Sequence, residues 1–564
     1  MKPRLLKFGM VAAITLLPLQ SAWAEAPLKL VLQITVDQLR GDLIDRNIDH
    51  FGDGGFRYLL ANGIYYTNAH HRHANTETIV GHTTLATGTD PAVHGMVANL
   101  WFDRKSGKPF YNVQDPDYPL LANSGVDQSS EIDPTQRAAT SDGRSPVSIL
   151  SSTLSDEISI ANAGASKIFG VSVKDRGAIS MAGHSGTAYW FSKSEGRFVT
   201  SSYYMDAYPG WVDNWNDSGH VLAYADQAWE LKDGVETYRF GEMDDVEWET
   251  DFPGFGRSFP HPYDQSGVKY YTTLLTLSPA GDELTAGFAK ELVDREQIGQ
   301  DSIPDYLSVS FSSTDYVGHI FGPSSLEAED NLRRLDQTIS DLLQHVDARV
   351  GLENTLVVLS ADHGAAEVPG YLNSLGIPAS YFSFDDIDKQ PAAKALTAEF
   401  GAAEELIESF SQPYVYLDET VLEAKGLEKS DVAGKLASEL QKFQGIAFAI
   451  SSEDLASAAV SKTSVSDAIL ANFHSERSGD IYVVFEPHWF VGDMDGLTVA
   501  SHHGSPWEYD THVPIVFSRP GMKSQRISDR VETVDLAPTV AAYLKIKAPS
   551  GSRGKVLRNV LEAQ

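Results

Sequence analysis

The sequence predicts an α/β fold with a mostly parallel sheet and helices on both of its faces. Short runs rich in β-branched residues and leucine recur along the chain, and apolar residues at helical spacing lie between several of them. Continuous apolar runs of this length are typical of strands buried on both faces, as in parallel sheets. The strands are expected at residues 28–36, 168–173, 306–311, 355–359, 481–485 and 514–517.

The clearest helical pattern follows Pro323. Ser324 and Glu327 have the spacing of a capping box. Apolar residues then recur every three or four positions, which predicts one buried helical face made by Leu332, Leu335, Ile339, Leu342 and Val346. Another helix is expected to begin near Thr78 and to end at Gly88.

Two stretches interrupt the alternation of strands and helices. Residues 185–300 are rich in Trp, Tyr, Gly and Asp, and residues 365–480 carry helical segments of their own. We expect both to be insertions that cover the sheet, within a single domain of residues 25–564. The tryptophans of the first insertion are expected to fill its core, and they are Trp190, Trp211, Trp215, Trp229 and Trp248.

Residues 1–24 have the pattern of a secretory signal peptide. Basic residues precede an apolar run at 8–19, and small residues precede the expected cleavage site after Ala24. No later stretch approaches the roughly 20 apolar residues of a membrane-spanning helix. We therefore expect a soluble protein that is periplasmic or secreted.

The charge and cysteine content exclude several classes of function. Acidic residues outnumber basic ones by 77 to 44, and the formal net charge of −33 would repel nucleic acid and anionic membranes. The chain has no cysteine, which excludes disulfides, a lipid anchor on cysteine and thiol chemistry. An anionic small-molecule substrate would need local positive charge, from metal ions or a few basic residues.

Acidic and imidazole side chains follow several predicted strands. Asp37 ends the first strand. Asp315 and His319 lie four positions apart beyond a later strand, where one helical turn would place both on one face. Asp362 and His363 leave the next strand together. Because parallel strands present their carboxyl ends at one edge, these ligand types predict a site for divalent metal ions.

A hydroxyl and a further imidazole complete the candidate set. Thr78 lies at the expected start of a helix, where backbone N–H groups and the helix dipole stabilise an oxyanion or a phosphate. An ordinary helix cap is the alternative interpretation of this threonine. Of the adjacent His502 and His503, we favour His503 as a ligand.

Two basic residues and one amide are candidates for binding an anion. Lys174 and Arg176 end the strand at 168–173, and a spacing of two on an extended segment points both to one face. Two adjacent cations without an acid partner repel each other unless an anion lies between them, although a pair of surface charges is the alternative. Asn99 would offer an amide donor or be a turn residue.

Taken in order, these motifs resemble those of the alkaline phosphatase superfamily. The greatest resemblance is to the threonine-nucleophile, PafA-type alkaline phosphatases, which are related to the nucleotide pyrophosphatases and phosphodiesterases. The resemblance covers residues 28–545, and its motifs are the strand ending at Asp37, Thr78-x-x-Gly81-His82, Asn99-x-Trp101, Lys174-x-Arg176, Asp315-x-x-x-His319, Asp362-His363-Gly364 and His503-Gly504.

The resemblance implies an alkaline-phosphatase-like α/β/α sandwich that hydrolyses phosphate monoesters with two zinc ions. Thr78 would be the nucleophile and would form a phosphothreonine. One zinc ion would be held by Asp37, Thr78, Asp362 and His363, and the other by Asp315, His319 and His503. The phosphoryl oxygens would be bound by Asn99, Lys174 and Arg176.

Some features depart from the family pattern or leave alternatives open. Val80 stands where proline is common, Leu100 replaces a frequent second asparagine, and Thr76 is near enough to be an alternative nucleophile. A nucleotide pyrophosphatase or phosphodiesterase would share the metal ligands but lack the Lys174 and Arg176 pair. A binding protein that retains the ions without turnover is the third possibility. We expect the protein to act as a monomer.

Overall fold

Ten strands of the described chain form one central sheet. The computed structural model describes residues 27–121, 131, 133–263, 270–383, 391–401, 403–457, 460–494 and 497–563, so the predicted leader at 1–24 lies outside the described residues. From one edge to the other the strands are β21 (Gln525–Ile527), β2 (Gly63–His70), β20 (His512–Ser518), β11 (Thr355–Ser360), β1 (Leu30–Val36), β10 (Asp305–Phe311), β5 (Ile168–Ser172), β6 (Thr187–Ser192) and β7 (Arg197–Val199), and β22 (Val531–Glu532) pairs with β2.

Most neighbouring strands of this sheet run parallel. β1 pairs in parallel with β10 and β11, and β5 does so with β10 and β6. β20 runs antiparallel to β11 and β2, and β7 runs antiparallel to β6. The mostly parallel sheet is confirmed, and the strand predicted at 514–517 exists but runs against its neighbours.

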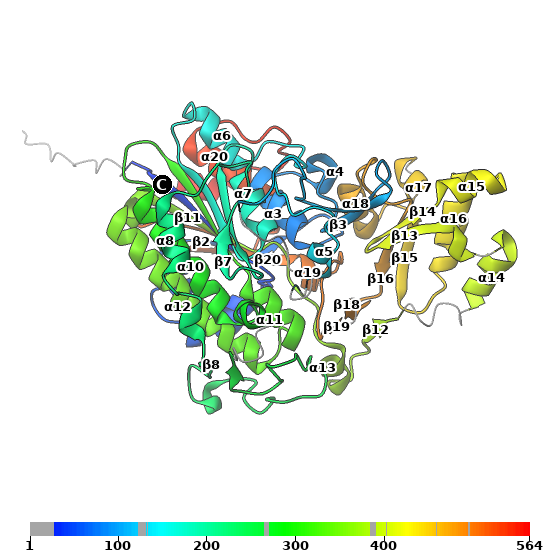
Figure 1. Cartoon of the computed structure of the whole chain (residues 1–564), viewed down its shortest axis with the longest axis horizontal. Coiled ribbons are helices and arrows are strands. Elements are labelled where there is room, and N and C mark those ends of the chain that lie inside the picture. Colours follow the sequence, from blue (N-terminus) through cyan, green and yellow to red (C-terminus); the bar gives the residue numbers. More distant parts are fainter. Residues whose placement is uncertain are drawn as a thin grey trace, which may run out of the picture.

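Alternate residues of the strands enter cores on opposite faces of the sheet. Leu307 and Val309 of β10 belong to a core shared with helices α10 (Pro279–Arg295) and α12 (Leu326–Arg349). Tyr306 of the same strand belongs to a core shared with α6 (Leu154–Ala161), α20 (Leu536–Leu544) and α21 (Arg558–Glu562). Figure 1 shows α10 and α12 on one side of the sheet and α6 and α20 on the other. This arrangement is the expected α/β/α sandwich.

The predicted apolar face of α12 is confirmed, but the helix starts differently. Ser325 is its N-cap, and Ser325 Oγ accepts a hydrogen bond from the Ala328 N–H at 3.1 Å. Ser324 donates instead to Glu367 at 2.8 Å, and Glu327 lies 3.3 Å from the ring of His261. Both residues of the predicted capping box therefore have long-range partners, which local spacing does not reveal.

A second, antiparallel sheet has a core of its own. Its strands, in order, are β13 (Ile407–Ser411), β14 (Tyr414–Leu417), β16 (Ile481–Phe485) and β15 (Ile446–Ser451), and helices α14 (Pro391–Phe400), α15 (Glu419–Lys425) and α16 (Lys429–Leu440) pack on it. Figure 1 shows it beside the central sheet. The strand predicted at 481–485 thus lies outside the central sheet, which corrects its expected place. The expected single domain with two insertions remains a prediction.

The tryptophans of residues 185–300 are structural where the structure describes their packing. Trp190, Trp215 and Trp229 are at most 6% exposed and lie in hydrophobic cores, and Trp211 packs against one of them. This region includes α8 (Gly210–Asp217) and the short pair β8 (Ala228–Trp229) and β9 (His261–Pro262). Within the described residues, no helix combines the length and the apolar character that crossing a bilayer requires.

Candidate active site

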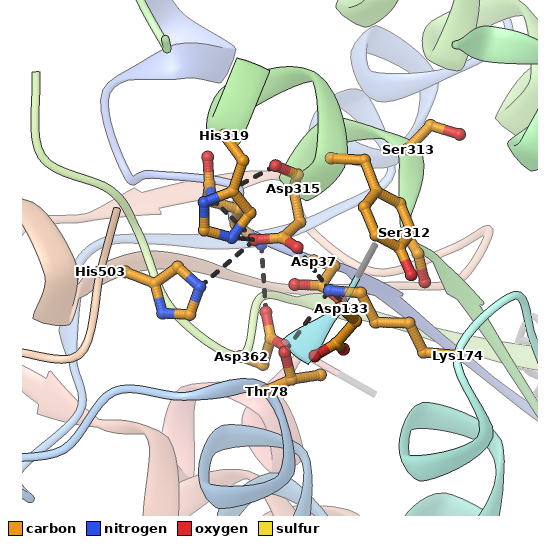
Figure 2. Close-up of polar contacts among 12 residues, drawn as sticks. Asp37, Thr78, Asp133, Lys174, Ser312, Ser313, Asp315, His319, Asp362 and His503 are labelled. Atoms are coloured by element: carbon orange, nitrogen blue, oxygen red, sulfur yellow. Dashed lines mark hydrogen bonds and ion pairs between the residues drawn. The ribbon is translucent and has the colours of Figure 1, made fainter. Parts of the chain in front are cut away.

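The carboxyl ends of four neighbouring parallel strands bring the predicted residues together. Asp37 follows β1, and Asp362 follows β11 on one side of it. On the other side, Asp315 lies in α11 (Ser313–Phe321) after β10, and Lys174 follows β5. Figure 2 shows these side chains directed toward a common centre. An open parallel sheet presents ligand-binding groups at this edge.

Asp37, Asp362 and His363 form a first, fully buried cluster. One ligand atom of each lies within 4.8 Å of the others. His363 Nε2 lies 3.4 Å from Asp37 Oδ1 and 3.5 Å from Asp362 Oδ2. Among the described residues, Asp37 Oδ1 and His363 Nε2 have no hydrogen-bond partner. Two ligands about 2.1 Å from a tetrahedral Zn²⁺ lie about 3.4 Å apart, so this cluster fits a metal ion.

Asp315, His319 and His503 form the second predicted cluster. Asp315 Oδ1 lies 3.2 Å from His319 Nε2 and 3.4 Å from His503 Nε2, which again are separations between ligands of one ion. His319 is one turn beyond Asp315 in α11, as predicted. His503 comes from the loop before α19 (Glu508–Thr511). Figure 2 shows both rings facing the carboxylate of Asp315.

The three imidazole rings have the same orientation relative to the clusters. The Nδ1 atom of each ring hydrogen-bonds a backbone carbonyl, and the pairs are His319 with Ser501 at 2.9 Å, His363 with Gly364 at 2.9 Å and His503 with Thr76 at 2.8 Å. A carbonyl only accepts, so Nδ1 carries the proton and Nε2 presents a lone pair to the carboxylates. Metal-binding histidines are held in this way.

Thr78 lies between the clusters and two cations. It is the first residue of α3 (Thr78–Thr87), which ends at Gly88 as predicted. Glu77 is the N-cap, so Thr78 is not the helix cap. Thr78 Oγ1 lies 3.5 Å from Lys174 Nζ and 3.4 Å from Arg176 Nη2. The hydroxyl is therefore beside two positive charges and the positive end of the helix dipole.

The alternative nucleophile, Thr76, is engaged within its own loop. Its hydroxyl donates to the Ser505 carbonyl at 3.0 Å and accepts from the Gly504 N–H at 3.2 Å. These bonds hold Thr76 against the loop that carries His503. The geometry thus favours Thr78 over Thr76 as the candidate nucleophile.

Lys174 and Arg176 reach the site by a geometry that differs from the prediction. Lys174 is the N-cap of α7 (Asp175–Ala182) and Arg176 lies in its first turn, so they do not share an extended segment. Lys174 Nζ lies 2.7 Å from Asp37 Oδ2 and 2.5 Å from Asp315 Oδ2. Burial alone would lower the pKa of Lys174, but the charges of Asp315 and Asp37 outweigh it and raise this pKa. The expected absence of acid partners was wrong.

Arg176 is held by Asp133 and Tyr111, neither of which the sequence indicated. Arg176 Nη1 donates to Asp133 Oδ2 at 2.7 Å and to the Tyr111 hydroxyl at 3.3 Å. The Tyr111 hydroxyl in turn donates to Asp175 Oδ1 at 2.6 Å. These buried contacts fix the guanidinium with Nη2 toward Thr78.

Asn99 is positioned by the start of α3. Its Oδ1 accepts a hydrogen bond from the Ile79 N–H at 3.1 Å, which leaves Nδ2 as the donor for a ligand. The N–H of Asn99 donates to the Glu77 carboxylate at 2.5 Å, and Asn75 Nδ2 donates to the same carboxylate at 3.2 Å. Burial raises the pKa of Glu77 to about 7. Glu77, like Asp133, was missed by the sequence analysis.

Gln38 connects the two clusters, and no sequence signal marked it. Its φ of +67° lies in the left-handed region, which non-glycine residues rarely adopt. Its N–H donates to Asp362 Oδ1 at 3.1 Å, and its Nε2 donates to Asp315 Oδ1 at 2.6 Å. One residue thus orients a carboxylate of each cluster.

A cavity of about 750 Å³ opens onto these residues. Apolar residues from the neighbouring regions share its wall, including Phe382 of β12 (Ser380–Phe382) and Phe410 of β13. The predicted site residues that line it are Thr78, Asn99, Arg176, Asp315, His319 and His503. The cavity can therefore admit a small molecule to the hydroxyl of Thr78.

Known proteins resemble this chain over nearly its full length. The alkaline phosphatase PafA of Elizabethkingia meningoseptica is 33% identical over 99% of each chain. A protein named calcium-transporting ATPase from Myroides odoratus is 34% identical over 95% of each, and the alkaline phosphatase PhoV of Synechococcus elongatus is 32% identical over 95% of this chain and 93% of its own. The crystal structure of wild-type PafA matches with a TM-score of 0.84 and 32% identity, over 95% of this chain and 99% of that one.

A family model also matches most of the chain. Residues 31–512 match the model described as type I phosphodiesterase / nucleotide pyrophosphatase. The matched segment contains the sheet strands β1, β10 and β11 and the site residues from Asp37 to His503. The chain therefore belongs to the type I phosphodiesterase / nucleotide pyrophosphatase family of the alkaline phosphatase superfamily.

Proposed function

We propose that this protein is a zinc-dependent alkaline phosphatase that hydrolyses small phosphate monoesters to an alcohol and inorganic phosphate. It acts as a monomer in the periplasm or outside the cell. Two relatives that align over more than nine-tenths of the chain are named alkaline phosphatases, which supports the activity. The leader pattern of residues 1–24 supports export.

The observation that carries this proposal is the position of two cations beside one hydroxyl. Lys174 Nζ and Arg176 Nη2 lie 3.5 and 3.4 Å from Thr78 Oγ1. A phosphoryl group attacked by that oxygen would have its non-bridging oxygens within reach of both. A monoester dianion gains more from two cations than a singly charged diester does.

The two clusters provide ligands for two zinc ions. Asp37, Thr78, Asp362 and His363 would hold one ion, and Asp315, His319 and His503 the other. The unpartnered Asp37 Oδ1 and His363 Nε2 support this assignment, and mixed imidazole and carboxylate ligands suit Zn²⁺. When bound, the ions supply positive charge that lowers the pKa of the Thr78 hydroxyl and stabilises the departing alcohol oxygen.

The reaction proceeds in two displacements at phosphorus. Thr78 Oγ1 forms a bond to phosphorus while the bond to the alcohol oxygen breaks, which gives a phosphothreonine and releases the alcohol. Lys174 Nζ, Arg176 Nη2 and Asn99 Nδ2 donate hydrogen bonds to the non-bridging oxygens. Water then attacks the phosphothreonine from the opposite side, releases phosphate and restores the hydroxyl of Thr78.

A comparison of two substrates tests this function. We would measure kcat/KM of the zinc-loaded protein on p-nitrophenyl phosphate and on bis-p-nitrophenyl phosphate at alkaline pH. A large preference for the monoester is expected. A preference for the diester would assign the nucleotide pyrophosphatase or phosphodiesterase activity instead, and metal binding without turnover of either would support a binding protein.

Replacement of the nucleophile tests the mechanism. Thr78→Ala should abolish phosphate release, because the Thr78 hydroxyl lies within 3.5 Å of both Lys174 Nζ and Arg176 Nη2, whereas the Tyr111 hydroxyl contacts Arg176 Nη1 and donates to Asp175. Thr78→Ser is the matched control, since it keeps the attacking oxygen and should retain activity. Full activity of Thr78→Ala would refute the phosphothreonine.

A further inference from the structure

The cavity above Thr78 is larger than a phosphoryl group requires. Its volume is about 750 Å³, within the range of about 300–1,000 Å³ in which proteins enclose most of a small-molecule ligand. The phosphoryl group would occupy only the end lined by Thr78, Asn99 and Arg176. The remaining space is available to the alcohol part of a monoester, to which the reaction above assigns no binding site.

The geometry of the displacement places the alcohol on the side of the second cluster. The attacking and departing oxygens lie roughly in line at phosphorus, so the alcohol oxygen faces away from Thr78. In the proposed reaction it points toward Asp315, His319 and His503, which line the cavity. Ile320 follows His319 in α11 and also lines the cavity. The lining beyond the second cluster is therefore the part that meets the alcohol.

A pair of parallel strands forms the wall beside His319. β12 pairs with β17 (Trp489–Val491), and Tyr381 and Val491 of this pair line the cavity. The Tyr381 hydroxyl donates to the Ala500 carbonyl at 2.9 Å, and the Ala500 N–H donates to the His319 carbonyl at 2.8 Å. These bonds fix the strand pair next to the second cluster and use the hydroxyl proton of Tyr381 within the protein.

More apolar side chains extend this wall. Phe382 of β12, Leu497 and Val499 also line the cavity. Phe410 of β13 lines it from the second sheet and is 36% exposed. A large apolar side chain that stays exposed in a cavity gains free energy when a ligand covers it. The wall therefore favours an apolar alcohol over a hydrophilic one.

The charged residues of the lining oppose a second negative group on the alcohol. Among the described residues, Arg176 is the only arginine or lysine that lines the cavity, and it serves the phosphoryl end. Asp493, two positions after Val491, adds an exposed carboxylate to the wall. A second phosphate or a carboxylate on the alcohol would lose hydration in the cavity without gaining a cationic partner.

We propose that this cavity selects monoesters of apolar, uncharged alcohols, with aryl and arylalkyl phosphates as the chemical class. It discriminates against alcohols that carry a second phosphate or a carboxylate. The apolar wall supplies the attraction, and the charges of the lining supply the discrimination. The inference rests on the proposed function and names the substrate class of the same site.

Four alkyl phosphates test both parts of this inference. Ethyl and 2-phenylethyl phosphate differ by an aromatic ring, and 2-(4-carbamoylphenyl)ethyl and 2-(4-carboxyphenyl)ethyl phosphate differ by one negative charge. We expect kcat/KM of the zinc-loaded protein to be at least ~10-fold higher for the phenylethyl ester than for the ethyl ester, because the wall covers the ring. The carbamoyl ester should exceed the carboxylate ester at least ~3-fold, and high salt should reduce this difference.

Phe410→Ala tests whether the wall is the source of the preference. Because Phe410 is exposed, its removal leaves the core of the second sheet in place, and the ratio of phenylethyl to ethyl ester hydrolysis should fall at least ~3-fold. Phe448→Ala is the matched control, since Phe448 lies in β15 of the same sheet but is not among the residues that line the cavity, and it should not change the ratio. Val491→Ala carries the same test if Phe410→Ala does not fold.

The outcomes separate this inference from the proposed function. Equal kcat/KM on the ethyl and phenylethyl esters, or faster hydrolysis of the carboxylate ester, would overturn the inference and leave the phosphatase proposal intact, since all four substrates are monoesters. A preference for the ring that Phe410→Ala and Val491→Ala both leave unchanged would also overturn it, because the apolar wall would not be its source. No turnover of these esters or of p-nitrophenyl phosphate would refute the proposed function, and the inference with it.

Discussion

Replacement of Arg176 by alanine tests how the site distinguishes a monoester from a diester. Nη1 of Arg176 already donates to Asp133 and Tyr111, whereas Nη2 lies 3.4 Å from Thr78 Oγ1. Nε has no hydrogen-bond partner among the described residues, so Nη2 and Nε remain to bind a phosphoryl group. Arg176→Ala therefore removes at least one charge-assisted interaction from the transition state.

The loss of a single such interaction sets the smallest effect that we expect. A hydrogen bond to a charged group contributes about 1.5–3 kcal/mol, which corresponds to a loss of about 10- to 150-fold in kcat/KM for a monoester. A diester carries one negative charge where the monoester dianion carries two. The diester should therefore gain about half as much electrostatic stabilisation from Arg176, and Arg176→Ala should lower its kcat/KM roughly 3- to 12-fold.

The assay compares the two substrates in the same preparations. We would measure kcat/KM on p-nitrophenyl phosphate and bis-p-nitrophenyl phosphate for the wild type, Arg176→Ala and Asp133→Asn. Asp133→Asn is the matched control, because it removes the carboxylate but keeps the guanidinium and its contact with Tyr111. It should lower monoester hydrolysis less than Arg176→Ala does.

The ratio of the two losses decides the outcome. A loss on the monoester that exceeds the loss on the diester several-fold is expected. Equal losses would show that Arg176 does not respond to the charge of the substrate, and the choice of a monoesterase would lose its physical reason. A loss in Asp133→Asn as large as in Arg176→Ala would show that the guanidinium acts only when paired.

Three further outcomes concern the support of the site, its ions and its buried acids. A Cβ on Gly81 would lie 1.9 Å from the Asp362 carbonyl oxygen, so Gly81→Ala should displace Asp362 and lower kcat/KM at least ~10-fold. Gly434→Ala should leave kcat/KM unchanged, because a Cβ on Gly434 would meet no atom of the described residues within 4 Å. Dialysis against a chelator should abolish turnover and Zn²⁺ should restore it; activity that survives complete metal removal would contradict the proposed ligands. Burial raises the pKa of Asp282 from 3.8 to about 7, so the folded state binds the proton more tightly than the unfolded state does. As pH rises from about 4 to about 7, the wild type should therefore lose stability relative to Asp282→Asn. At about 1.4 kcal/mol per pKa unit, the loss is roughly 4 kcal/mol. Denaturant unfolding across that range measures the difference, and parallel stability curves would refute it.

The sheet was predictable where local periodicity determines structure. β1, β10, β11 and β5 carry continuous apolar runs, and their bounds match the predicted strands within two residues. β2 was not predicted, because Thr67 and Asn68 interrupt its apolar run, at the register shift between Tyr66 and Ala69. The direction of β20 and the sheet to which β16 belongs depend on long connections, and the composition of a strand does not encode them.

The site residues were predictable where they follow predicted strands. Asp37, Asp362 and His363 follow strands directly, and parallel strands end at one edge, so their convergence follows from the fold. The residues that orient these side chains, such as Gln38 and Asp133, were not predictable from the positions of the strands. Gln38 donates to a carboxylate 324 positions away, and Asp133 pairs with a residue 43 positions away. Only the tertiary structure brings these partners together.

The charges at the centre explain why the ions and the substrate depend on each other. The carboxylates of Asp37, Asp315 and Asp362 exceed the ammonium of Lys174 by two charges, and Asp133 balances Arg176. Without ions, a phosphate dianion would meet a negative centre in a protein whose formal net charge is −33. Two divalent ions would reverse the sign of this centre. Metal removal should therefore abolish the binding of phosphate as well as its release, and equilibrium dialysis with inorganic phosphate would distinguish this effect from the loss of a catalytic step alone.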